Sequence, residues 1–143
     1  MSNYFSDKQV KLLAEAKSSK NYVHLKNENQ SLKDIMNLKN LNKIISMHNC
    51  WDRNNFSLVL DKNIIPFPSF STDGNDLGFS KMSPDPIKVE NYIKKGASLV
   101  LNDLIYFSKD IQLLADDLQI ITNGKCQANL YFSMQSHQAF APH

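Results

Sequence analysis

The sequence predicts an α+β fold, that is, one chain that contains both helices and strands. The chain has 143 residues, which is enough to bury a sizeable hydrophobic core without disulfide or metal support. Apolar residues make up 42% and charged residues 21%, which is typical of folded domains. Apolar residues recur at helical spacing in some segments and alternate in others, so both kinds of element are expected. We therefore expect a single domain over residues 1–143.

Charge and cysteine content argue against several classes of protein. The net charge is +2 and the lysines are scattered, so there is no direct signal for a nucleic-acid partner. Cys50 and Cys126 lie far apart and match no metal-binding spacing, which indicates neither a zinc site nor a disulfide framework. The polar N-terminus lacks the apolar stretch of a signal peptide, and no window reaches the roughly 18 apolar residues of a membrane-spanning helix. We expect a cytoplasmic protein with no membrane segment.

The first third of the chain is predicted to be mainly helical. Ser6 is a candidate N-cap and Gln9 stands three residues later, in the capping-box position. The amphipathic pattern that follows predicts a helix to about Lys17. A second helical region is expected from Ser31 to Ile45, because apolar residues again recur at helical spacing.

The middle of the chain contains strand signals and a long irregular segment. Residues 22–25 are a brief strand candidate. Residues 56–66 alternate and are rich in β-branched residues, which predicts a strand that ends at Pro66. Residues 66–85 are rich in Pro, Ser, Gly and Asp and predict a long loop. Loops of this length are usually either functional or mobile, and both interpretations stay open.

A helix and a strand are predicted next, with clear boundaries. Asp85 is a candidate N-cap, and Pro86 follows at the first helical position, where its missing N–H costs nothing. The helix is expected to end at Gly96, which can adopt the left-handed conformation of a C′ residue. The buried-type strand 98–103 follows directly.

The last third is predicted to contain the longest helix and a final strand. Asp103 is a candidate cap for a helix over residues 104–118. An apolar stripe at three- and four-residue steps predicts a core-facing side for this helix. The stripe consists of Leu104, Phe107, Ile111, Leu114 and Leu118. Asn123 and Gly124 predict a turn, and residues 125–132 predict the final strand.

The sequence of the last third of the chain resembles that of a known protein family. The stretch KKGASLVLNDL, the helix after it and the ending QANLYFSMQSHQAFAPH are similar to the cupin-fold JmjC oxygenases of the ribosomal-oxygenase type. In that family a helix that ends in Gly is followed by a hydrophobic strand and a second helix. A strand with Asn-x-Tyr comes next, and after it a Gln and a Pro-His, whose histidine is the first residue of an H-x-D motif. The similarity covers residues 85–143, and upstream it extends only to the order of elements.

The resemblance implies a specific fold. It implies a helical lead-in followed by the first strands of a cupin domain, also called a double-stranded β-helix or jelly roll. Because the family's pattern continues past the position of His143, this domain is expected to be incomplete. Residues 1–143 are therefore interpreted as the N-terminal portion of a JmjC/cupin-like oxygenase domain.

The resemblance also implies the residues of a site. His143 stands at the first metal-ligand position of H-x-D, where the family binds Fe(II) with an aspartate and a distal histidine that this chain does not contain. Asn129 and Tyr131 match the Asn-x-Tyr whose side chains reach the 2-oxoglutarate pocket. Residues i and i+2 of a strand share one face, which agrees with this pairing. Gln138 and Pro142 match the family's glutamine and proline.

Three functions remain open on this basis. The resemblance implies the N-terminal part of an Fe(II)- and 2-oxoglutarate-dependent dioxygenase that hydroxylates a side chain on a protein, often a ribosomal one. Such a part is expected to be inactive alone, since two of the three metal ligands are not among its residues. The first alternative is a non-catalytic cupin-like binding or remnant module. The second is an unrelated α+β domain, in which Asn129 is an ordinary hydrogen-bonded residue and Tyr131 a half-buried aromatic.

Overall fold

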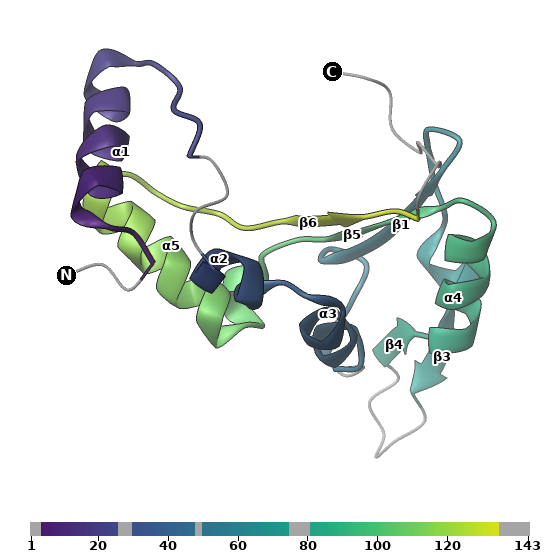
Figure 1. Cartoon of the computed structure of the whole chain (residues 1–143). Helices are drawn as coiled ribbons and strands as arrows, with labels where there is room; N and C mark the ends of the chain where they lie inside the picture. The colour runs from purple at the N-terminus through teal and green to yellow at the C-terminus, as the bar shows by residue number, and fades with distance from the viewer. Residues whose placement is uncertain (1–3, 26–29, 48–49, 75–80, 135–143) are drawn as a thin grey trace. The chain divides into compact units, whose positions relative to one another are not determined.

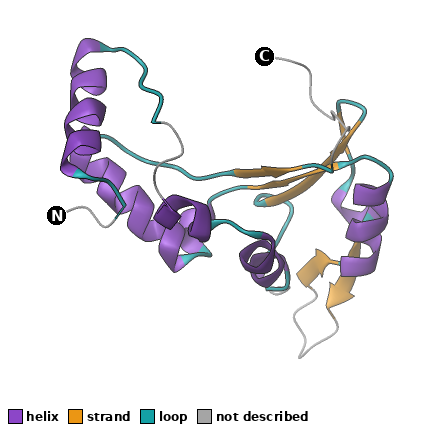
Figure 2. Cartoon of the chain, in the orientation of Figure 1, coloured by secondary structure: helices purple, strands orange, loops and turns teal. Residues whose placement is uncertain are grey.

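The predicted α+β class is confirmed by a computed structural model of the chain, which combines helices with two small antiparallel sheets (Figures 1 and 2). The structure describes residues 4–25, 30–47, 50–74 and 81–134. The chain divides into two compact units, which are described separately below. The first comprises Met1–Ile44 and Leu104–Ala128, and the second comprises Ile45–Asp103 and Asn129–His143. Among the described helices, none has the length and apolar character required to cross a membrane.

The first helix of unit 1 begins and ends at local signals in the sequence. Helix α1 spans Asp7–Ser19, and Ser6 is its N-cap. The Ser6 N–H donates to Gln9 Oε1 at 2.9 Å, and the Gln9 N–H donates to Ser6 Oγ at 3.4 Å. Lys20 ends the helix in a left-handed conformation. The predicted capping box is therefore confirmed.

The second helical region of unit 1 consists of two helices rather than one. Helix α2 spans Gln30–Ile35 and helix α3 spans Leu38–Ile45. The chain leaves the helical path between them, and the Asn37 side-chain oxygen accepts the Asn40 N–H at 2.9 Å. Asparagine favours such a break because its side chain competes for backbone hydrogen bonds.

The predicted strand at residues 22–25 is wrong. Residues 21–25 lie in no regular element, and Tyr22 is 91% exposed. A strand is stabilised by pairing and by burial of one face, and local composition supplies neither.

Helix α5 spans Lys109–Thr122 and lies beside α1 in unit 1. Its N-cap is Ser108, which accepts the Ile111 N–H at 3.4 Å, so the predicted cap at Asp103 is wrong. Asp103 has φ +59°, a left-handed conformation in which the helix cannot start. A short 3₁₀ turn, η3 (Leu104–Tyr106), precedes α5 instead. The predicted turn after the helix is confirmed, since Asn123 is left-handed with φ +47°.

Unit 2 is built on a four-stranded antiparallel sheet with the order β2-β1-β5-β6. The strands are β1 (Phe56–Leu60), β2 (Asn63–Ile64), β5 (Ser98–Leu101) and β6 (Leu130–Phe132). The predicted single strand over residues 56–66 is in fact a hairpin. Asp61 and Lys62 both have positive φ, which produces the two-residue turn that suits the twist of paired strands. Strand β6 is shorter than the predicted range of 125–132.

Helix α4 (Pro86–Lys94) has the predicted boundaries. The Asp85 side chain accepts the N–H groups of Ile87 and Lys88, as an N-cap does. Gly96 has φ +100°, and its N–H donates to Ile93 O at 3.0 Å. These contacts confirm both ends of the helix.

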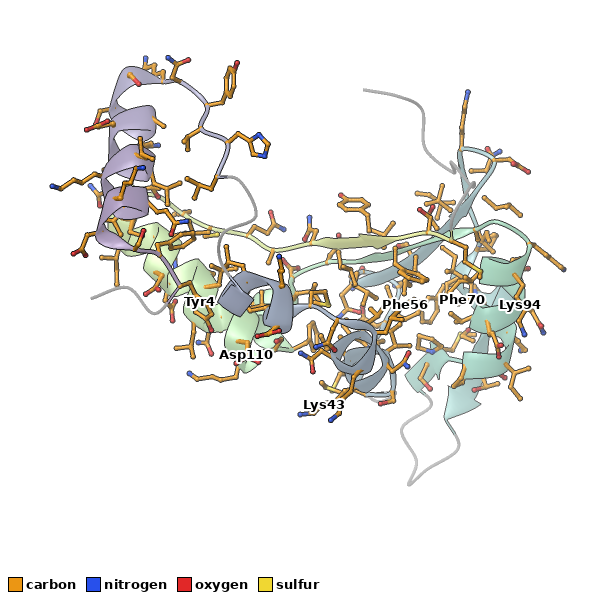
Figure 3. All side chains as sticks on the ribbon, viewed as in Figure 1. Tyr4, Lys43, Phe56, Phe70, Lys94 and Asp110 are labelled. Carbon is orange, nitrogen blue, oxygen red and sulfur yellow. The ribbon has the colours of Figure 1, made fainter. Side chains whose placement is uncertain are left out.

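One face of the sheet is packed by a chain of aromatic rings. The ring centroids of Trp51 and Phe56 are 5.9 Å apart, as are those of Phe56 and Phe70. The Phe70 ring is 6.4 Å from that of Tyr92 in α4. Trp51, Phe56 and Phe70 are at most 1% exposed, and Figure 3 shows Phe56 and Phe70 together in this interior. The rings therefore connect β1 to α4.

The predicted long loop over residues 66–85 is wrong for its described part. It contains the 3₁₀ turn η2 (Phe67–Ser69) and a separate antiparallel hairpin of β3 (Ser71–Gly74) and β4 (Lys81–Pro84). Phe70 anchors the segment in the core, which composition alone does not indicate.

Candidate functional site

The four-stranded sheet has two different faces, which follow from its register. Residues that pair across strands share a face, and alternate residues of each strand point to opposite faces. One face, which we call the core face, holds two apolar rows. These rows are Phe56–Leu101–Leu130 and Leu58–Leu99–Phe132. Their members in β1 and β5 are at most 1% exposed.

The opposite face, which we call the Tyr131 face, is only partly buried. Tyr131 lies in the middle of β6, opposite Val100, which in turn lies opposite Ser57. Val59 and Val100 are buried on this face and form a small apolar cluster. Tyr131 remains 62% exposed, and Ile64 in β2 remains 74% exposed. Exposure of the Tyr131 face is therefore greatest on the outer strands, at Tyr131 in β6 and Ile64 in β2, whereas Val59 and Val100 between them are buried.

Asn129 lies directly before β6, two residues from Tyr131. Its side-chain oxygen accepts the backbone N–H of Asp103 at 3.2 Å. Asn129 is exposed, and its side-chain nitrogen has no partner among the described residues. The side-chain oxygen of Asn129 is therefore already used as an acceptor, whereas the two N–H groups of its amide can still donate.

Asn129 belongs to a group of Asn and Asp residues at one end of the sheet, where β1 begins, β5 ends and β6 begins. We call this the Asx end; it comprises Asp52, Asn54, Asn55, Asn102, Asp103 and Asn129. The Asp52 N–H donates to Asn55 Oδ1, and the Asn54 N–H donates to Asp52 Oδ1, each at 2.8 Å. The Asn102 side chain donates to Asn54 O at 3.3 Å. These side chains bind the backbone where the chain enters β1 and leaves β5.

The structure brings together only part of the predicted site. Tyr131 lies in β6, and Asn129 lies directly before this strand. His143, with Gln138 and Pro142, lies outside the described residues. The bond from Asp103 to Asn129 was missed, although an Asn-Asp pair directly after a buried strand is a known turn signal.

The described residues do not by themselves fit an iron site. No group of three or more His, Cys, Asp or Glu side chains that could hold a metal ion occurs within residues 4–25, 30–47, 50–74 and 81–134. Cys50 is exposed and Cys126 half-buried, and both are free thiols. The roles of Fe(II) and 2-oxoglutarate therefore stay predictions.

Tyr4 in unit 1 is the residue whose ionisation is most clearly perturbed within the described part of the chain. Its hydroxyl donates to Asp110 O at 3.3 Å, and its N–H donates to Asp117 Oδ2 at 3.3 Å (Figure 3). Partial burial, followed by the negative charges of Asp110 and Asp117, raises the pKa of the Tyr4 hydroxyl above its usual value of 10.0. These bonds connect Tyr4 to α5.

Comparisons of the chain with protein-family models, with curated protein sequences and with solved structures find no match.

Proposed function

We propose that this chain supplies the N-terminal part of a cupin-fold hydroxylase that depends on Fe(II) and 2-oxoglutarate and acts on a protein side chain. The observation that carries the proposal is the asymmetry of the four-stranded sheet. Its core face is filled by the aromatic chain that leads to α4, whereas its other face presents Tyr131 at 62% exposure. A jelly roll packs two sheets face to face, so one face of each sheet lines the interior. The Tyr131 face would be this inner face.

The chemistry of the two matched residues supports a co-substrate with oxygen acceptors. A tyrosine hydroxyl donates a hydrogen bond, and the Asn129 amide has its nitrogen available for donation. The carboxylate and keto oxygens of 2-oxoglutarate accept such bonds. Asn129 and Tyr131 are therefore proposed to bind the co-substrate, and His143 is proposed as one Fe(II) ligand whose partners lie beyond this chain.

The proposed substrate is a side chain on a protein, with ribosomal proteins as the first class to test. A cytoplasmic location, where such substrates are made, is part of the same proposal. An exposed aromatic side chain on the outer strand of the sheet would equally suit a non-catalytic cupin-like module that holds a partner. The gene sequence distinguishes the two: an Asp codon two positions after the His143 codon favours the hydroxylase, and a stop codon favours the module.

Titration of the longer gene product with Mn(II) and then with 2-oxoglutarate tests the hydroxylase. His143→Ala is expected to abolish Mn(II) binding, because loss of one of three ligands leaves a site that competes poorly with water. Tyr131→Phe is expected to spare the metal and to weaken 2-oxoglutarate binding by about 0.5–1.5 kcal/mol, the net value of one hydrogen bond.

Two matched controls accompany these variants. His24→Ala removes an exposed histidine, and Tyr22→Phe removes the hydroxyl of a tyrosine that is 91% exposed; neither should change binding. Tight Mn(II) binding by His143→Ala would contradict the proposed metal site. Unchanged 2-oxoglutarate binding by Tyr131→Phe would remove Tyr131 from the co-substrate pocket.

A further inference from the structure

Asp103 leaves the sheet ladder at the end of β5. The register pairs Leu101 with Leu130, so its continuation would place Asn102 opposite Asn129 and leave Asp103 beyond the ladder. Asp103 adopts φ +59°, a conformation that the Cβ of a non-glycine residue disfavours. Its N–H takes part in an exposed hydrogen bond whose acceptor is a side chain.

Asn129 provides that acceptor across 26 positions of sequence. The Asp103 N–H donates to Asn129 Oδ1 at 3.2 Å. A side-chain amide thus replaces the main-chain carbonyl where the chain turns away from β5. The same bond connects the segment after β5 to the residue directly before β6, and Tyr131 follows two residues later.

We infer that Asn129 is a positioning residue: its amide oxygen stabilises the left-handed Asp103 and thereby sets where β6 begins and how Tyr131 is presented. The inference deepens the proposed function and rests on it only for the role of Tyr131. The bond also determines which atom of the Asn129 amide can bind a ligand. Because the oxygen accepts the Asp103 N–H, the amide nitrogen is the group that can donate to a ligand. Asn129 therefore stabilises the backbone at Asp103 and, through the backbone, positions Tyr131 in the proposed co-substrate site.

Amide hydrogen exchange of the 143-residue chain, read residue by residue by NMR, tests the bond directly. Asn129→Ala should increase the exchange rate of the Asp103 N–H by about tenfold or more, because its acceptor is removed. Asn129→Asp retains an acceptor oxygen and should restore most of the protection. Asn102→Ala removes a neighbouring side chain that donates to Asn54 O and should leave the Asp103 N–H unchanged.

A coupling experiment tests the stabilising role independently. Glycine adopts positive φ without a Cβ penalty, so Asp103→Gly should make the Asn129 bond less necessary. The fall in thermal midpoint caused by Asn129→Ala should therefore shrink by at least about half in the Asp103→Gly background. An equal fall in both backgrounds would overturn the inference, as would unchanged Asp103 exchange in Asn129→Ala or equal loss of protection in Asn129→Asp.

These measurements need no metal or co-substrate. A chain that shows the predicted exchange pattern but whose longer gene product binds no 2-oxoglutarate would support the positioning role of Asn129 and contradict the proposed hydroxylase. The reverse result would contradict the positioning role alone.

Discussion

The aromatic chain of unit 2 predicts a large and specific loss of stability when Phe70 is truncated. Phe70 is fully buried, and its ring lies 5.9 Å from Phe56 and 6.4 Å from Tyr92. Phe70→Ala should lower the free energy of unfolding by about 3–5 kcal/mol, the usual cost of truncating a buried phenylalanine. Since small domains are stable by only about 5–15 kcal/mol, this loss approaches the point of unfolding.

A conservative variant separates packing volume from ring contacts. Phe70→Leu keeps an apolar side chain but loses three ring pairs, with Phe56, Phe67 and Tyr92. Each pair is worth about 0.5–1.5 kcal/mol, so a total loss of about 1.5–4.5 kcal/mol is expected. Urea unfolding followed by the fluorescence of Trp51 measures both variants. Trp51 is the single tryptophan of the chain, is 0% exposed and has its ring 5.9 Å from that of Phe56.

The control is Ile64→Ala, which truncates an apolar side chain that is 74% exposed. Its effect should stay within about 0.5 kcal/mol, as for most surface substitutions. If Phe70→Ala shifted the urea midpoint no more than Ile64→Ala, the rings would not form the core that connects β1 to α4, and the assignment of the core face would be refuted.

Two further predictions concern backbone strain and ionisation. Lys62→Gly should raise the free energy of unfolding, measured in urea, by about 1 kcal/mol, because Lys62 has φ +67° and glycine adopts this conformation without strain. An unchanged or lower urea midpoint of unfolding would contradict a strained turn at Lys62. The raised pKa of Tyr4 means that the folded state holds this proton more tightly than the unfolded state. The contribution of Tyr4 to stability should therefore be constant below pH ~9 and fall as the pH rises through about 10 towards the higher folded pKa. Urea midpoints across this range should show the extra fall in the parent and in Tyr22→Phe but not in Tyr4→Phe; an identical pH profile for the parent and Tyr4→Phe would contradict it.

The candidate site illustrates how far sequence reasoning extends. The final strand was predicted over residues 125–132, but β6 begins only at Leu130, so Tyr131 lies in its middle and Asn129 lies directly before it. The same reasoning treated Asp103 as a helix cap, whereas its N–H is bound by Asn129 at the end of β5. Spacing along a strand is a local property of the chain. The partner of Asp103 lies 26 residues away, and no local pattern identifies it.

Two other segments, residues 56–66 and the segment around Phe70, also have structures that local sequence patterns do not predict. Residues 56–66 have strand composition throughout, yet Asp61 and Lys62 turn the chain back on itself. Asp61 tolerates positive φ, but Lys62 stands where such a turn usually has glycine, so pairing of β1 with β2 stabilises a turn that the local sequence specifies only in part. Phe70 likewise organises a segment whose composition predicts only a loop.

The sequence by itself determined the α+β class and the ends of its best-defined helices. Ser6 with Gln9, and Asp85 with Gly96, form their caps with partners a few residues away, so their outcome depends little on the rest of the chain. Only the tertiary structure decided which apolar side chains fill the core face of the sheet and that Tyr131 is exposed on the opposite face. Register and burial arise from contacts between segments far apart in sequence, and their energies are set by packing rather than by local preference.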